Sequence, residues 1–150
     1  MEKPPELMAI NTPTQDILIE NLDEGMKKYF KVCKEKIGFI PNVLLSFAFR
    51  PEKLKNFVST YNELMLGESG LSKLEREMIA VVVSSTNHCF YCVVAHGQAV
   101  RQLSGDPELS EKLSINYRTA GLDKKQKAML DFAYKLTKEP SLIESRDRDR

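Results

Sequence analysis

Two cysteines and a histidine, Cys89, Cys92 and His96, follow one another at spacings of three and four residues. On a helix that turns about 100° per residue, their side chains fall within an arc of about 60°. Both thiols then lie in or near the first turn, where free amides and the positive end of the helix dipole favour thiolate over thiol. His96, one turn beyond Cys92, can take its proton or hydrogen-bond to the thiolate. The spacing predicts a reactive cysteine pair.

Glu77 is a carboxylate inside an apolar helical stripe. The stripe, whose members recur every three or four positions, is Leu74, Met78, Val81, Val82 and Ser85. A carboxylate in such surroundings is costly unless it is paired. Because Glu77 lies one helix before the thiols, we hypothesise that it contacts His96, directly or through water, and completes a proton relay. The alternative is an ordinary solvated or salt-bridged helix residue.

Other residues near the motif have weaker claims to a role. His88 is adjacent to Cys89 but about 100° off its face, and Tyr91 points largely away, so each is at most a supporting residue. Cys33 is expected to be a small core residue. Gly97 costs roughly 1 kcal/mol against Ala in a helix interior, so it either marks close helix packing beside the site or is incidental.

Zinc is the main chemical alternative, because the two cysteines, His96 and His88 offer thiolate and imidazole ligands. Structural zinc, however, usually takes its ligand pairs from two separated pieces of chain, and four ligands within one helix cannot readily surround a tetrahedral ion. Haem attachment needs a histidine directly after the second cysteine, where Val93 stands. A thioredoxin fold needs a βαβ context. We therefore expect no metal site.

Composition indicates one globular domain over residues 1–150, which buries roughly two thirds of its unfolded surface without disulfides or metal. The 22 Lys and Arg nearly balance the 21 Asp and Glu, without a basic stripe, which argues against nucleic acid as a partner. No signal peptide is recognisable, and the longest apolar run, Met78–Val83, is too short to cross a bilayer. Three cysteines argue against a disulfide framework. We expect a cytoplasmic protein that contacts no membrane.

Apolar residues recur at helical spacing almost throughout, and no segment alternates as a half-buried strand does. The sequence therefore predicts an all-α chain with a polar arm at 1–20 and a charged tail at 145–150 that has nothing to bury. Capping residues and prolines mark the helix ends. The expected helices run from Asn21 or Asp23 to about Lys36, before Gly38; from Pro41; from Pro51; from the Ser72 and Glu75 capping box to about Thr86; from an Asn87 cap to about Leu103; from Asp106; and from Asp123 to Lys138, before Pro140.

The reactive motif resembles that of the alkylhydroperoxidase D-like proteins of the carboxymuconolactone decarboxylase superfamily, in particular their peroxidase-related branch. Their signature is a Glu followed twelve residues later by Cys-x-x-Cys-x-x-x-His. It is matched at every position by Glu77, Cys89, Cys92 and His96. Residues 37–42, 70–72 and 75–81 also look like this branch, so the resemblance covers roughly residues 25–140.

The resemblance implies a compact multi-helix bundle whose subunits usually assemble into homo-oligomers. It also implies a peroxidase mechanism, in which the Cys92 thiolate, activated by His96 and Glu77, attacks a hydroperoxide and becomes a sulfenic acid. Cys89 then condenses with it to form a disulfide, which an external dithiol must reduce. The implied partners are a hydroperoxide and a dithiol electron donor, and no tightly bound cofactor is expected.

Two departures from the family pattern bear on this expectation. The founding peroxidases have a His between the cysteines that joins the relay, where this chain has Tyr91, which implies weaker peroxidase activity or another substrate. Members of this branch also commonly continue for two helices beyond the equivalent of Glu144, so this chain can be a fragment. The alternatives are the decarboxylase or lyase branch, which does not rely on a cysteine pair, and a non-catalytic redox sensor that uses the disulfide as a switch.

Overall fold

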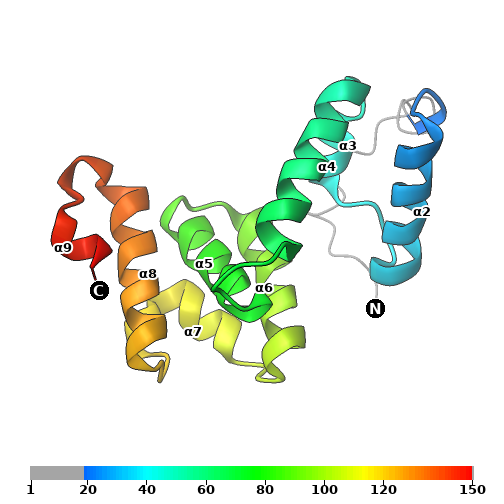
Figure 1. The fold of residues 1–150 in the computed structure, drawn as a ribbon. Helices are drawn as coiled ribbons and strands as arrows, with labels where there is room; N and C mark the ends of the chain where they lie inside the picture. Colours follow the sequence, from blue (N-terminus) through cyan, green and yellow to red (C-terminus); the bar gives the residue numbers. More distant parts are fainter. Residues whose placement is uncertain (1–18, 150) are drawn as a thin grey trace. The chain divides into compact units, whose positions relative to one another are not determined.

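The computed structural model describes residues 19–149, which contain helices and no strand (Figure 1). The all-α prediction is therefore confirmed. The chain divides into two compact units, one ending at Gly67 and the other beginning at Glu68. The single domain over residues 1–150 stays a prediction. The predicted arm at 1–20 lies almost wholly outside the described residues.

In its described part, the first unit consists of helices around one apolar core. They are α2 (Glu24–Ile37), α3 (Asn42–Phe47) and α4 (Pro51–Leu66). Asp23 caps α2 by accepting a hydrogen bond from the Met26 amide at 2.9 Å, and Gly38 ends it in the left-handed conformation at φ 89°. Pro51 opens α4, as predicted. Cys33 is a free cysteine buried in this core, as expected of a packing residue.

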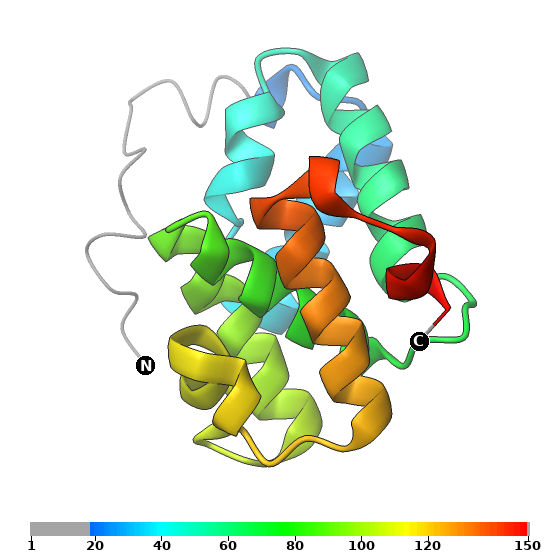
Figure 2. The same cartoon turned by 90° about the vertical axis from the view of Figure 1, so that its left-hand side faces the viewer.

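The second unit carries the predicted reactive motif. Its elements are α5 (Lys73–Thr86), α6 (Phe90–Ser104), α7 (Leu109–Asn116), the 3₁₀ turn η2 (Tyr117–Thr119), α8 (Lys124–Lys138), the 3₁₀ turn η3 (Pro140–Leu142) and α9 (Ser145–Arg148). Helix α5 is central, because it packs against α6, α7 and α8 (Figure 2). Their shared core consists of Met78, Val81, Val82, Val100, Leu113, Tyr117 and Leu130. This packing fixes α5 against α6, the two helices that hold the motif.

Capping residues fix where the helices of the second unit begin. Ser72 accepts a hydrogen bond from the Glu75 amide at 3.1 Å while Glu75 accepts one from the Ser72 amide at 2.7 Å, so the predicted capping box of α5 is confirmed. Asp123 and Gln126 form the equivalent box at the start of α8. Within residues 19–149, no helix has the length and apolar character needed to cross a membrane.

Two predicted boundaries are wrong. Helix α6 begins at Phe90 with Cys89 as its cap, not after an Asn87 cap, because His88 is left-handed at φ 55° and breaks the helical path. Helix α7 begins at Leu109, later than the expected start at Asp106. Within the predicted charged tail, Ser145–Arg148 form the short helix α9, which has no buried residue. The 2.6 Å ion pair between Lys135 and Asp147 attaches it to α8.

Candidate redox site

The turn between α5 and α6 places Cys89 at the start of a helix. The Cys89 amide donates to the Ser84 carbonyl at 2.9 Å, which closes the turn at the end of α5. The left-handed residue His88 then redirects the chain, and Cys89 becomes the N-cap of α6. Its Sγ accepts a hydrogen bond from the Cys92 amide at 3.4 Å. A side-chain acceptor at this position satisfies one of the free amides of the first turn.

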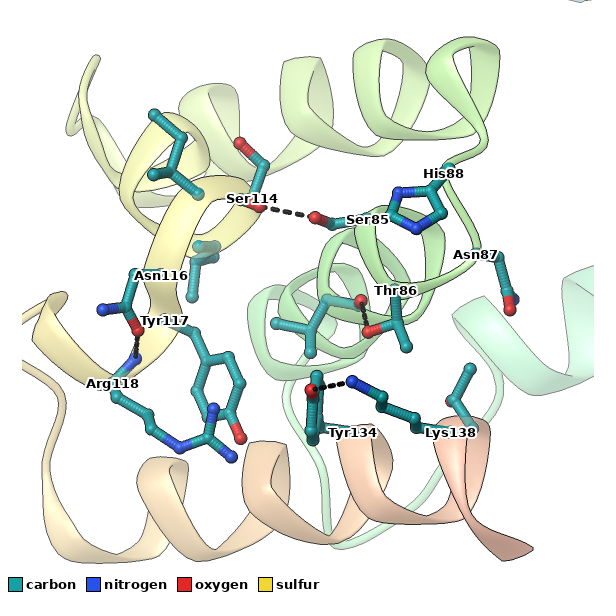
Figure 3. A pocket seen from close by; sticks show the side chains of 14 residues that line it. Ser85, Thr86, Asn87, His88, Ser114, Asn116, Tyr117, Arg118, Tyr134 and Lys138 are labelled. Atoms are coloured by element: carbon teal, nitrogen blue, oxygen red, sulfur yellow. Dashed lines mark hydrogen bonds between the residues drawn. The ribbon is translucent and has the colours of Figure 1, made fainter.

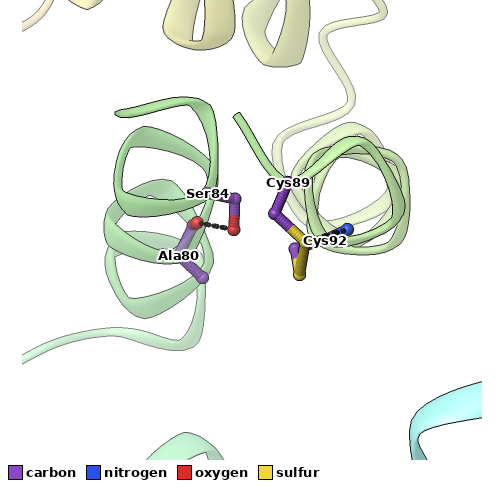
Figure 4. Close-up of a disulfide and its surroundings, with 4 residues drawn as sticks. All are labelled: Ala80, Ser84, Cys89 and Cys92. Carbon is purple, nitrogen blue, oxygen red and sulfur yellow. Dashed lines mark hydrogen bonds between the residues drawn. A yellow bond between two sulfur atoms is a disulfide. The ribbon is translucent and has the colours of Figure 1, made fainter. Parts of the chain in front are cut away.

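Cys89 and Cys92 form a disulfide, with their Cα atoms 5.4 Å apart (Figure 4). Both side chains are partly buried. In the figure the disulfide faces α5 at Ala80 and Ser84, and the Ser84 hydroxyl donates to the Ala80 carbonyl at 2.5 Å. One sulfur from the cap and one from the first turn thus share the positive end of the α6 dipole.

The predicted contact between Glu77 and His96 is present. Oε2 of Glu77, on α5, lies 2.8 Å from Nδ1 of His96, on α6. The carboxylate side chain is 13% exposed and the imidazole 23% exposed, so water screens this pair less than a surface ion pair. A carboxylate can only accept, so Nδ1–H donates this hydrogen bond and Nε2, at the opposite edge of the ring, is the nitrogen with the free lone pair.

The helix register relates this pair to the sulfurs. Cys92 and His96 are four residues apart on α6, a spacing at which helical side chains are neighbours on one face. Cys89 joins them through its disulfide. The four predicted site residues therefore come from two packed helices. They form two pairs, the disulfide of Cys89 with Cys92 and the contact of Glu77 with His96.

Tyr91 and His88, the two possible supporting residues, lie in different surroundings. Tyr91 occupies the first turn of α6, between the cysteines, and is partly buried. His88 is exposed and lines a groove with residues of α7 and α8, away from the contact between Glu77 and His96. Within residues 19–149, no three His, Cys, Asp or Glu side chains form a cluster that could hold a metal ion.

The partner against which Gly97 packs was not predicted from the sequence. Gly97, directly after His96, is buried against Ser110 of α7, and a Cβ on Gly97 would overlap the Ser110 hydroxyl oxygen. The close packing considered for Gly97 is therefore present. In the sequence, the glycine in a helix interior was the only sign of this packing. Nothing in the sequence pointed to Ser110 on α7 as the partner. This contact holds α6 and α7 together next to the imidazole.

Two solved structures are similar to this chain over most of its length. One is the crystal structure of an uncharacterized peroxidase-related protein from Silicibacter sp. TM1040, with 58% identity and a TM-score of 0.85 over 99% of this chain and 76% of that one. The other is an alkylhydroperoxidase AhpD core, an uncharacterized peroxidase-related protein from Ralstonia eutropha JMP134. It has 37% identity and a TM-score of 0.82 over 87% of this chain and 69% of that one.

Curated relatives match a shorter stretch. Sestrin-1 from Xenopus laevis is 26% identical over 109 residues, and Sestrin-1 from Macaca fascicularis is 26% identical over 97 residues. The matched part of this chain spans only 23% and 20% of the length of these two proteins.

The family model for the carboxymuconolactone decarboxylase family matches residues 51–133, more than half of the chain. The match contains both cysteines, His96 and Glu77, and it agrees with the solved alkylhydroperoxidase D-like folds. The chain belongs to the carboxymuconolactone decarboxylase family, within the superfamily of alkylhydroperoxidase D-like proteins.

Proposed function

We propose that this protein is a cysteine-dependent peroxidase that reduces hydroperoxides through Cys92 and Cys89. One observation carries the proposal: a disulfide at the start of α6 lies one helical turn before His96, which Glu77 on α5 holds at 2.8 Å. The peroxidase-related names of the two similar structures support the same reaction class.

In the first step, His96 takes the proton of the Cys92 thiol and becomes an imidazolium, and the resulting Cys92 thiolate attacks one oxygen of the peroxide. A sulfur–oxygen bond forms, the O–O bond breaks, and the leaving alkoxide takes a proton from His96 and departs as an alcohol. Cys92 is oxidised to a sulfenic acid and the peroxide is reduced. Glu77 keeps the His96 ring oriented and stabilises the imidazolium that precedes this proton transfer. Glu77 is therefore a positioning residue.

In the second step, the Cys89 thiolate attacks the Cys92 sulfur. The disulfide forms, and the hydroxyl of the sulfenic acid leaves as water after taking up a proton. Cys89 suits this role because its Sγ lies at the helix cap and accepts a hydrogen bond from the Cys92 amide. This hydrogen bond stabilises negative charge on the Cys89 sulfur. An external dithiol then reduces the disulfide by thiol exchange, giving two free thiols and an oxidised donor. No tightly bound cofactor takes part.

A homo-oligomer in the reducing cytoplasm also belongs to this proposal. The second unit exposes large apolar side chains that a partner subunit could cover: Phe90, Leu103, Ile115, Leu136 and Leu142. Light scattering of the purified protein tests the assembly, and a monomer at all concentrations would contradict it.

The function is tested by following consumption of cumene hydroperoxide with dithiothreitol as the donor. With the donor present, wild type is expected to turn over and Cys92→Ser to lose turnover. Without the donor, Cys89→Ser is expected to consume one equivalent of peroxide and to accumulate a trappable sulfenic acid, which wild type converts to the disulfide. Cys33→Ala is the matched control, because Cys33 is the third cysteine, lies in the first unit and is free. It is expected to retain the wild-type rate.

The outcomes separate the alternatives. Oxidation of one equivalent without turnover, with the donor present, would favour a redox sensor over an enzyme. Turnover that survives in Cys92→Ser would overturn the proposed site. A decarboxylase would act on its lactone substrate independently of both cysteines.

A further inference from the structure

The second unit has a groove of about 500 Å³ that the redox proposal does not use (Figure 3). It lies between the end of α5, the segment from the end of α7 through η2, and α8. None of the described residues that line it is Asp or Glu, although the chain has 21 of them. Arg118, Lys138 and His88 do line it. Its lining therefore favours negatively charged ligands.

Arg118 is held in a fixed orientation at this groove. Its guanidinium carbon lies 4.5 Å from the ring centre of Tyr117 and 4.8 Å from that of Tyr134. Its Nε lies 3.6 Å from a carboxylate oxygen of Asp131. In the described part of the chain, its two terminal nitrogens have no hydrogen-bond partner. A stacked guanidinium with this edge available suits the planar fork of a carboxylate or phosphate.

Lys138 supplies a second cation from α8. Its Nζ donates to the Tyr134 hydroxyl at 3.2 Å and lies 5.6 Å from the centre of the same ring. Among residues 19–149, no carboxylate lies within ion-pairing distance of this ammonium group. Tyr134 therefore links the two cations, since Arg118 stacks on its ring and Lys138 hydrogen-bonds its hydroxyl.

The remaining lining is mixed in polarity. Val82 and Leu113 contribute buried apolar surface, and Asn87 and Asn116 contribute amides. The Ser85 hydroxyl is already engaged, because it donates to the Ser114 carbonyl at 2.5 Å and ties α5 to α7 at the groove. A ligand that matches this lining carries its negative charge at one end and an apolar body at the other.

We propose that this groove binds a small organic anion, through the Arg118 fork and the Lys138 ammonium, with an apolar body against the tyrosine rings. The charged group is a carboxylate or a phosphate monoester, which present the same oxygen fork to Arg118. The proposal is independent of the redox cycle, because neither cation belongs to the cysteine site.

Benzoate and phenyl phosphate are suitable probes, and benzamide is a neutral control of the same shape as benzoate. Binding is followed on the full chain by chemical-shift titration at constant ionic strength. Saturable shifts are expected at Asn87, Asn116 and the Tyr117 and Tyr134 rings. Benzoate is expected to bind at least about fivefold tighter than benzamide, the ratio that corresponds to one charged contact. The anion that binds more tightly shows whether the groove prefers a carboxylate or a phosphate monoester.

Three substitutions test the contacts. Lys138→Gln and Arg118→Gln should each weaken benzoate binding about fivefold or more, and Arg118→Lys should restore only part of it, since it keeps the charge and loses the fork. Lys127→Gln is the matched control, because it removes one exposed charge from the same helix outside the groove. If Arg118→Gln fails to fold, Lys138→Gln and the benzamide comparison still decide. Equal shifts with benzamide, equal losses in Lys127→Gln, or no saturable shift would overturn the proposal.

Discussion

Glu77 and His96 are nineteen residues apart in sequence, yet Oε2 of one lies 2.8 Å from Nδ1 of the other. The contact joins α5 to α6. In the proposed mechanism Nε2 is the ring nitrogen that serves the thiols, because Nδ1 is engaged by the carboxylate. Under the proposed mechanism, the carboxylate acts on the thiols through the imidazole, since among the described residues it makes no hydrogen bond to either sulfur.

Replacing Glu77 with Gln should slow alkylation of the reduced cysteines without unfolding the protein. The amide keeps the shape of the side chain but cannot stabilise an imidazolium, and loss of such a partner typically costs 10-fold to 100-fold in the function of the histidine it orients. Iodoacetamide alkylation at Cys92 across pH, with circular dichroism as the folding check, measures the effect. Glu68→Gln, an exposed residue of the same unit, is the control. An unchanged rate profile would refute the relay.

The fold was predictable where local signals agree with tertiary packing. Ser72 and Glu75 predicted the start of α5, and Asp123 predicted the start of α8. Both starts were predictable because each cap needs only residues within one turn. The pairing of Glu77 with His96 was also predictable, since a carboxylate in an apolar stripe requires a partner and the next helix held a suitable one.

Features that depend on tertiary position escaped prediction. The left-handed conformation of His88, which delays α6 until Phe90, is imposed by the turn from α5 and has no signature in a histidine. Nothing in the sequence singles out Arg118, because its tyrosine neighbours come from different elements, η2 and α8. Local sequence cannot reveal neighbours that only packing brings together.

Gly97→Ala should destabilise the second unit although alanine favours helices. The new Cβ would overlap the Ser110 hydroxyl oxygen, and overpacking of this kind costs about 1–3 kcal/mol. In Ser110→Ala the overlap disappears, so adding Gly97→Ala to that variant should be neutral or stabilising by up to about 1 kcal/mol. Urea unfolding of the four proteins gives the coupling energy. Additive effects of the two substitutions would show that the contact is not tight.

Acid should weaken the attachment between α5 and α8. The hydrogen bond that Lys125 donates at 2.8 Å is the main cause that lowers the pKa of Glu75 from 4.5 to about 2. The hydrogen bond from the Ser72 amide is the second cause. A lowered folded-state pKa stabilises the protein above the unfolded value of 4.5, and this stability is lost as pH falls from 4.5 towards 2. Because Lys125 is 62% exposed, screening reduces the contribution to about 1 kcal/mol.

Glu75→Gln should therefore remove that part of the acid sensitivity, since the amide does not titrate. The free energy of unfolding, measured in urea at several values between pH 5 and pH 2, should fall less steeply in the variant than in wild type. Glu68→Gln serves again as the control, because Glu68 is exposed. Identical slopes in Glu75→Gln and wild type would contradict the role of this carboxylate.

The effect of substitutions at His88 on the free energy of unfolding should depend on how well the new residue adopts a left-handed backbone. At φ 55° a β-branched side chain is strained, so His88→Val should lower the free energy of unfolding by about 1–2 kcal/mol. Glycine adopts this conformation readily, and His88→Gly should change stability by less than about 1 kcal/mol, because the relief in the folded state is offset by the greater freedom of the unfolded chain. Asn87→Val is the control, since Asn87 is also exposed but has φ −85°. Thermal unfolding of the three variants measures the difference, and equal losses in His88→Val and His88→Gly would mean that the imidazole, rather than the backbone, matters at this turn.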